Sequence, residues 1–370
     1  MVAMRKAVLA TAGVGFGIAA RHLLKTRSKA DLRGKVVLIT GGSRGLGLAL
    51  ARQFAAEGCR LALCARNEQE LERAARDLES RGAEVRAFPC DVTDRVQVSR
   101  LVDRTTTHFG RIDVLVNNAG VIQVGPMENM AIEDFEYAMN VMFWGVVYTT
   151  LAVLPQMLSR NGSAAGRIVN ITSIGGKVSV PHLLPYNCAK FAATAFSEGL
   201  RAELWGKGIV VTTIAPGLMR TGSYLNAWFK GNAERESTWF GLSASMPAIS
   251  MDAARAARQI VKATKRGDSE KVLTTAATVL ARAHGLFPGA TSALLGAAAP
   301  AFASRLAPRR EGERSGRGDA PVTLALAQAA SASGAQGCRA LPPARMVQAP
   351  NQFEHSGRFL TLAESLLSHR

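Results

Sequence analysis

The stretch Thr-Gly-Gly-Ser-Arg-Gly-Leu-Gly, residues 40–47, lies between a short apolar run and a segment with helical spacing. The run at 36–39, Val-Val-Leu-Ile, is typical of a strand that is buried on both faces of a parallel sheet. After the glycines, leucines and a phenylalanine recur at spacings that a packed helix uses. Glycines permit a tight turn and a close approach of a ligand, and a helix N-terminus offers free N–H groups to a phosphate. The stretch therefore predicts a nucleotide site at a strand-to-helix turn.

The alternation of strand-like and helix-like segments continues to about residue 275. Seven strands alternating with helices predict an α/β fold with a doubly wound, seven-stranded, mostly parallel sheet. The predicted strands lie at 36–40, 60–64, 84–88, 112–116, 167–172, 209–214 and 270–274. The predicted helices lie at 45–57, 67–81, 94–108, 133–160, 185–205 and 250–264.

Composition allows a large core and narrows the class of partner. The chain has 370 residues, 48% of them hydrophobic, and a formal net charge of +17. It carries no zinc-finger spacing, no RNA-binding signature and no basic stripe interleaved with aromatics, which argues against a nucleic-acid partner. Its five cysteines are scattered without a CxxC and its six histidines do not cluster, so we expect no disulfide framework, no metal site and a reducing, cytoplasmic location.

Both ends of the chain differ from the middle. Residues 1–33 contain an apolar run at 7–20 between basic residues, shorter than the roughly 20 residues of a spanning helix. This run is interpreted as a membrane-surface tether, a signal peptide or a docking helix. Residues 276–306 are rich in alanine and leucine and predict helices that cover a pocket or lie on a membrane. Residues 307–370 have the composition of a disordered tail.

Further polar residues follow the predicted strands, at the edge of the sheet where ligands bind in such folds. Asp91 follows the third strand, and Asn-Asn-Ala-Gly at 117–120 follows the fourth. Ser173 ends the fifth strand. Tyr186 and Lys190, four residues apart on the next predicted helix, share one helix face.

These residues resemble the motifs of the classical short-chain dehydrogenase/reductase family. The glycine pattern TGxxxGxG is 40–47, NNAG is 117–120, the Tyr-x-x-x-Lys pair is 186–190, and a Pro-Gly pair is 216–217. The resemblance covers about residues 34–275, and no motif residue departs from the pattern. It implies a Rossmann-like catalytic domain, an NAD(P)-dependent enzyme acting on CH–OH groups, and a homodimer or homotetramer.

The chemistry of the residues agrees with that resemblance. A free tyrosine has a pKa of about 10, and a lysine cation one helical turn away favours the phenolate. Tyr186 is therefore expected to be the acid/base and Lys190 to lower its pKa. Ser173 is expected to hydrogen-bond the substrate oxygen. The resemblance implies that Lys190 also holds the nicotinamide ribose and that Asn140 holds a water linking Lys190 to solvent.

The charge near the second strand predicts NADP rather than NAD. An NAD site of this architecture places an acid at the end of that strand, and here Arg66 and Asn67 stand there instead. Arg66 and Arg44 are placed to bind a 2′-phosphate. The expected cofactor contacts, several of them implied only by the resemblance, are Gly41, Ser43, Arg44, Gly45, Leu46, Gly47, Arg66, Asp91, Val92, Asn118, Ala119, Tyr186, Lys190, Pro216, Gly217, Met219 and Thr221.

Substrate choice is expected to come from loops above the strand ends. The loop at 218–249 either lines a pocket for a lipophilic carbonyl or alcohol substrate or forms a helical lid packed on its own domain. It carries Leu218, Met219, Tyr224, Leu225, Trp228, Phe229, Trp239 and Phe240. Three other interpretations remain open: a 3-ketoacyl-(acyl-carrier-protein) reductase, a non-catalytic NADP-binding sensor or scaffold, and a membrane-surface or nucleic-acid binder that acts through its charge.

Overall fold

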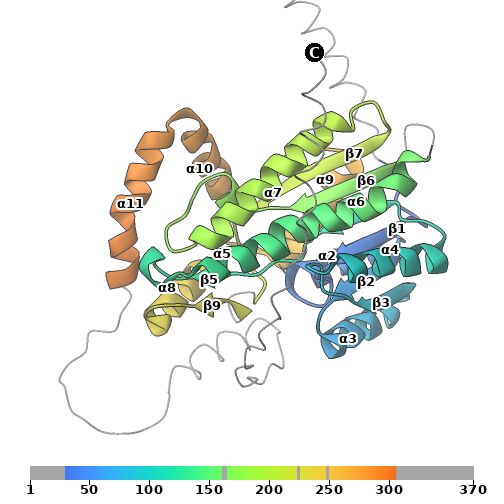
Figure 1. Cartoon of the computed structure of the whole chain (residues 1–370), viewed down its shortest axis with the longest axis horizontal. Coiled ribbons are helices and arrows are strands. Elements are labelled where there is room, and N and C mark those ends of the chain that lie inside the picture. The colour runs from blue at the N-terminus through green and yellow to red at the C-terminus, as the bar shows by residue number, and fades with distance from the viewer. Residues whose placement is uncertain (1–29, 161–164, 223–225, 247–249, 306–370) are drawn as a thin grey trace, which may run out of the picture. The chain divides into compact units, whose positions relative to one another are not determined.

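The computed structural model describes residues 30–160, 165–222, 226–246 and 250–305, and its centre is a seven-stranded sheet (Figure 1). The strand order is β11-β7-β6-β4-β1-β2-β3, and all neighbouring strands are parallel. The chain builds outward from β1 to β3, returns to the middle and continues to β11, which is the predicted doubly wound, Rossmann-like arrangement. The strands are β1 Val36–Thr40, β2 Arg60–Ala65, β3 Val85–Pro89, β4 Val114–Asn117, β6 Gly166–Ile171, β7 Ile209–Pro216 and β11 Glu270–Leu273.

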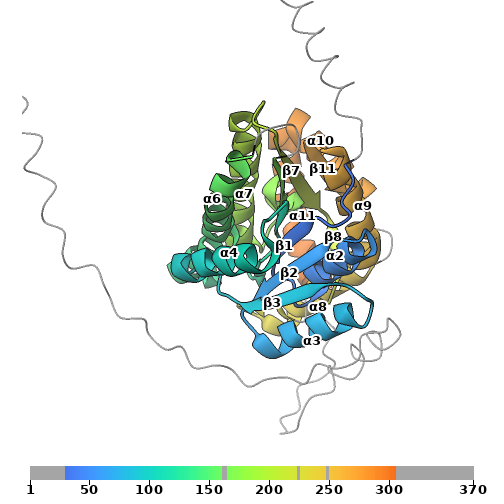
Figure 2. The same cartoon turned by 90° about the vertical axis from the view of Figure 1, so that its right-hand side faces the viewer.

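Helices cover both faces of the sheet (Figure 2). One face packs against α2 Gly45–Ala56, α3 Glu68–Glu79 and α9 Ala253–Arg266. The other packs against α4 Arg95–Phe109, α5 Ile132–Met139, α6 Gly145–Leu158 and α7 Leu184–Glu203. Successive residues of the fully buried strand β1 serve the two faces in turn, because side chains alternate along a strand: Ile39 packs with Phe54 of α2, and Leu38 packs with Leu101 of α4.

The predicted strand and helix boundaries lie within two residues of the observed ones, with two exceptions. The last predicted helix, 250–264, begins only at Ala253, because Asp252 caps α9 and Ser250–Asp252 form a short strand, β10. The predicted helix at 133–160 is not one regular α-helix. A π-helical turn, η2 (Asn140–Trp144), separates α5 from α6.

Shorter elements gather after the strand ends. β10 pairs with β8 (Leu218–Arg220), and β5 (Gln123–Val124) pairs with β9 (Trp228–Phe229). The loop at 218–249 contains a helix, α8 (Ala233–Ser245). Two single turns, η1 (Met127–Asn129) and η3 (Ile174–Gly176), precede α5 and α7.

After β11 the chain forms α10 (Thr275–Leu286) and α11 (Pro288–Arg305), on either side of the Phe-Pro-Gly break. Among the residues described, one helical stretch, Ile132–Leu158, is long and apolar enough to cross a membrane by length and composition. It is the α5–η2–α6 helix that packs against the sheet. The predicted tether, signal or docking segment at the N-terminus and the predicted disordered tail lie outside the described residues.

Candidate active site

The glycine loop joins β1 to α2 in a conformation that depends on glycine. Gly41 and Gly45 have φ angles of +64° and +55°. A Cβ atom on Gly47 would lie 2.0 Å from the carbonyl oxygen of Gly41. The start of α2 therefore packs closer to the loop than any other residue at position 47 would permit.

The N-terminus of α2 has no side-chain cap, unlike those of α3 and α4. Arg44, the residue before the helix, makes no capping hydrogen bond, and the first turn has no acid. By contrast, Asn67 caps α3 and Asp94 caps α4. The uncapped N–H groups and the glycine backbone form a cradle that fits the pyrophosphate of a dinucleotide.

Asn118 and Thr40 lock this cradle to the next strand of the sheet. The Asn118 side-chain amide donates to the carbonyl oxygens of Thr40 and Gly41, at 3.0 Å and 3.1 Å. The Thr40 hydroxyl accepts from the backbone N–H groups of Asn118 and Ala119, at 2.9 Å and 3.1 Å. The amide of Asn118 thus positions the glycine loop.

Ser173, Tyr186 and Lys190 lie together where β6 ends and α7 begins. The Nζ atom of Lys190 lies 5.8 Å from the centre of the Tyr186 ring. It donates a 2.8 Å hydrogen bond to the carbonyl oxygen of Ile171. The Ser173 hydroxyl accepts a 3.0 Å hydrogen bond from the backbone N–H of Gly175, and it lies close enough to the Tyr186 phenol to lower the phenol's pKa. The structure thereby brings three of the four expected catalytic residues to one place.

Two glycines that sequence reasoning did not single out make this packing feasible. A Cβ atom on Gly175 would lie 3.1 Å from the Tyr186 ring, and one on Gly176 would lie 2.6 Å from the carbonyl oxygen of Lys190. The signal was a glycine pair one residue beyond the strand-end serine, in the sequence Ser-Ile-Gly-Gly at 173–176.

Burial is the main cause of the pKa shifts of Tyr186 and Lys190. It raises the pKa of Tyr186, and the nearby Ser173 hydroxyl opposes part of that rise. Burial also lowers the pKa of Lys190 to about 8. In the protein alone the pKa of Tyr186 is shifted upward, with burial of the phenol as the largest cause, so the lowering expected from Lys190 stays a prediction for the cofactor-bound site. The phenol stays protonated near neutral pH.

Asn140 is the first residue of the π-helical turn η2, and its side chain is exposed. Turns of this kind inside α-helices occur frequently at functional sites. The turn packs against α7, the helix that carries Tyr186 and Lys190. No local sequence signal marked the turn.

The expected 2′-phosphate contacts lie at the surface, and each has a protein partner. Arg66 donates a 2.9 Å hydrogen bond to the hydroxyl of Tyr137. Arg44 pairs with Glu70 at 3.4 Å, and the Ser43 hydroxyl donates to the same carboxylate at 3.3 Å. Sequence reasoning missed Glu70, which lies 26 residues from Arg44 along the chain.

The remaining expected contacts come from the ends of β3 and β7. The Asp91 carboxylate accepts two hydrogen bonds of 2.9 Å from Thr93, and Val92 next to it is buried. Pro216 ends β7. Met219 lies in β8, and Thr221 lies beside the glycine loop, 3.8 Å from the position of a Cβ on Gly45.

A buried polar cluster fastens α8 to the loop before α7. The Nδ1 atom of His182 lies 2.9 Å from the Glu236 carboxylate, which also accepts a 2.6 Å hydrogen bond from the Trp239 indole. Trp239 and Phe240 are buried in an apolar cluster against which Tyr186 packs. The packing of α8 agrees with the interpretation of the 218–249 loop as a helix packed on its own domain, and apolar residues of α8 adjoin Tyr186. That the loop lines a substrate pocket stays a prediction. Tyr224 and Leu225 lie outside the described residues.

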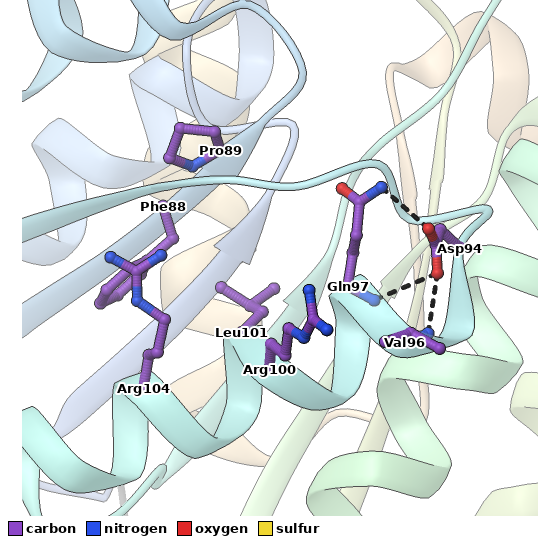
Figure 3. A pocket seen from close by; sticks show the side chains of 8 residues that line it. All are labelled: Phe88, Pro89, Asp94, Val96, Gln97, Arg100, Leu101 and Arg104. Carbon is purple, nitrogen blue, oxygen red and sulfur yellow. Dashed lines mark hydrogen bonds between the residues drawn. The ribbon is translucent and has the colours of Figure 1, made fainter.

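A separate hollow of about 400 Å³ lies between β3 and α4 (Figure 3). Arg104 stacks over Phe88 there, 4.9 Å from the ring centre, and the Asp94–Gln97 bonds in the figure belong to the cap of α4. Its lining shares no residue with the site above. Across the described ranges, no three His, Cys, Asp or Glu side chains are placed to hold a metal ion.

Comparison with known proteins agrees with the geometry of the glycine cradle and of the Ser173, Tyr186 and Lys190 group. The family model for short chain dehydrogenases matches residues 35–228. The chain is 41% identical over 206 residues to a dehydrogenase/reductase SDR family protein 7-like of Anopheles gambiae, covering 54% of this chain and 64% of that protein. It is 39% identical over 218 residues to 11-beta-hydroxysteroid dehydrogenase 1A of Arabidopsis thaliana, covering 58% and 60%. The chain thus spans less than two thirds of the length of these two relatives.

A bacterial relative is matched over nearly its whole length. The chain is 33% identical over 262 residues to the putative oxidoreductase SadH of Mycobacterium tuberculosis, covering 69% of this chain and 92% of that protein. Among solved structures, a short chain dehydrogenase/reductase from Burkholderia phymatum in complex with NAD superposes with a TM-score of 0.65 at 26% identity, covering 69% and 94%. With its parallel sheet, glycine cradle and Ser-Tyr-Lys group, the chain belongs to the short-chain dehydrogenase family.

Proposed function

We propose that the protein is an NADP-dependent oxidoreductase that interconverts a ketone or aldehyde and an alcohol. One observation carries the proposal. Ser173, Tyr186 and Lys190 lie together at the carboxyl edge of the same sheet that bears the glycine cradle. This is where a hydride donor and a carbonyl can meet in an open α/β sheet.

Tyr186 moves the proton in the proposed reaction. A bound nicotinamide supplies or accepts the hydride. Because burial raises the pKa of Tyr186, its phenol is protonated near neutrality and donates to the oxygen of a carbonyl under reduction. The Ser173 hydroxyl, which lies beside that phenol, orients the same oxygen. The proposed roles of Lys190 and Asn140 are to hold the ribose hydroxyls and a water that leads to solvent.

The preference for NADP rests on the two arginines at the rim. Arg44 flanks the glycine cradle, and Arg66 ends the region of β2 where an NAD site would carry an acid. The Glu70 carboxylate on Ser43 and Arg44 works against this preference, since a 2′-phosphate bound there must displace it from the arginine. We infer that Glu70 swings away when NADP binds.

The substrate is proposed to be lipophilic, since Tyr186 packs against the apolar cluster of Trp239, Phe240 and Leu183. The assembly is proposed to be a homodimer or homotetramer through η2, α6 and α7, where Trp144 and Phe191 are exposed while Val147 and Phe196 are half-buried. The second candidate, a 3-ketoacyl-(acyl-carrier-protein) reductase, is favoured by the net charge of +17, which suits an acidic partner.

The test is NADPH oxidation with a panel of ketones, aldehydes, steroids and 3-ketoacyl thioesters. We expect turnover in the wild type and a loss of at least about a thousandfold in Tyr186→Phe, with NADPH affinity retained. If Tyr186→Phe turns over at the wild-type rate, the assigned role of Tyr186 is wrong. Tight NADPH binding without turnover of any panel member points to the sensor or scaffold function instead.

Cofactor choice is tested by binding, independently of turnover. We expect Arg44→Ala to weaken NADPH binding at least about tenfold and to leave NADH binding unchanged. Glu70→Gln is expected to strengthen NADPH binding only. A wild type that binds NADH more tightly than NADPH would overturn the preference.

A further inference from the structure

The two helices after β11 expose an unusual amount of apolar surface. Val279, Leu286, Phe287 and Leu294 are 62%, 73%, 65% and 70% exposed. Val279 and Leu286, seven residues apart on α10, share one helix face, so they form a continuous strip that leads to the bend at Phe287. We call these four residues, with Arg282 between the first two, the α10–α11 surface.

Beyond Arg282, this surface lacks the charges that keep an exposed helix in water. No Asp, Glu, Lys or Arg occurs between Ala283 and Ser304, although most of residues 285–297 are exposed. Figure 1 shows α11 at the margin of the molecule, and its packing partners are α10 and α8. α11 has no charged side chain before its last residue, Arg305, and a helix so poor in charge and exposed to water calls for a covering partner.

The charges around the surface identify that partner. From Lys271 to Arg310 the chain has five basic residues and no acid. Exposed Arg282 lies on the same α10 face as Val279 and Leu286, three and four residues away, where its charged end reaches past the apolar strip. An apolar strip that carries a cation, in a stretch of sequence without acids, is complementary to a bilayer with anionic headgroups.

Charge disfavours the other possible partners of this surface, which are a second copy of the chain and the two ends of the chain itself. A second copy would oppose one cationic surface to an identical one. The N-terminal residues 1–35 carry eight basic residues and one acid, and residues 309–370 carry eight basic residues and five acids, so each of these segments is also cationic. Since like charges repel, neither end of the chain matches the surface as an anionic bilayer does.

We propose that the α10–α11 surface docks the protein onto an anionic lipid bilayer, with the bend at Phe287 buried among the headgroups. Neither α10 nor α11 is a candidate span by length and hydropathy, so the helices lie on the bilayer without crossing it. Because α11 packs against α8, docking brings the lid of the site to the membrane. The inference does not depend on the proposed reaction.

The experiment is flotation of the full-length protein with vesicles of phosphatidylcholine, with and without phosphatidylserine. The test variant is Leu286→Ser with Phe287→Ser. The matched control is Val96→Ser with Ile132→Ser, two apolar residues 58% and 66% exposed on other helices. Circular dichroism and the unfolding midpoint verify that each variant folds, and light scattering without vesicles reports the oligomeric state.

We expect the wild type and the control to bind the anionic vesicles. The test variant is expected to have a partition coefficient at least about tenfold lower, and Arg282→Glu to be weakened on anionic vesicles only. Equal binding of wild type and test variant overturns the proposal, because another segment then does the binding. A wild type that fails to bind, or a test variant that changes the oligomeric state, overturns it as well.

Discussion

Lys190→Met is expected to stabilise the protein while it removes the proposed function. Burial lowers the pKa of Lys190 from 10.5 to about 8, so the folded state disfavours the charged lysine. At pH 7 that difference corresponds to about 3 kcal/mol of lost stability. Lys190 is 5% exposed, so solvent screens little of this cost.

Part of the gain is offset by a lost hydrogen bond. Methionine leaves the Ile171 carbonyl oxygen without its 2.8 Å donor, which costs about 1–2 kcal/mol. The methionine side chain is unbranched and similar in length to that of lysine, so it fills the space that the Lys190 side chain occupies. The net expectation is that Lys190→Met raises the free energy of unfolding at pH 7 by about 1–2 kcal/mol.

The pH dependence separates this explanation from simple repacking. Between pH 8 and 10.5 the unfolded lysine is still protonated while the folded one is neutral, so the unfolded state binds more protons and wild-type stability rises with pH. The advantage of Lys190→Met should therefore shrink by about 2.5 kcal/mol between pH 7 and pH 10 and change sign. Urea unfolding of both proteins at these two pH values measures it. A difference between the two proteins that stays constant with pH would refute the reasoning.

Two more substitutions test how the site is held. Gly47→Ala places a methyl group 2.0 Å from the Gly41 carbonyl oxygen, so we expect a loss of at least about 2 kcal/mol in thermal unfolding and of dinucleotide affinity in titration. Gly199→Ala, on α7 with open space around it, is the control and should stabilise by about 0.5–1 kcal/mol. Glu236→Gln weakens the tie between α8 and His182, and we expect faster amide hydrogen exchange confined to α8. Glu234→Gln, exposed on the same helix, should exchange like the wild type, and an equal effect of both substitutions would mean that the tie does not hold the lid.

Local sequence patterns were sufficient to predict most strands and helices of the fold. Buried parallel strands such as β1 are short, continuous apolar runs, and glycine or a strand-end serine follows them directly, so both the strands and the edge that bears Ser173 were predictable. The π-helical turn at Asn140 was not, because its sequence is equally compatible with a regular helix. The contact between Arg44 and Glu70 joins residues 26 positions apart, and the contact between His182 and Glu236 joins residues 54 positions apart. No local sequence pattern relates residues at such separations.

The burial that raises the pKa of Tyr186 was not predictable from local sequence either. Four-residue spacing predicts correctly that Tyr186 and Lys190 share a face, but the spacing does not reveal how deeply that face is buried. Gly175 and Gly176 of η3 contribute to that burial, because they let α7 pack so close to η3 that a Cβ atom would not fit. The same close packing makes the lysine costly to keep charged and the tyrosine hard to deprotonate. A site that lowers the stability of its own fold is most simply explained by selection for what it binds, since an apolar residue at position 190 would make the protein more stable.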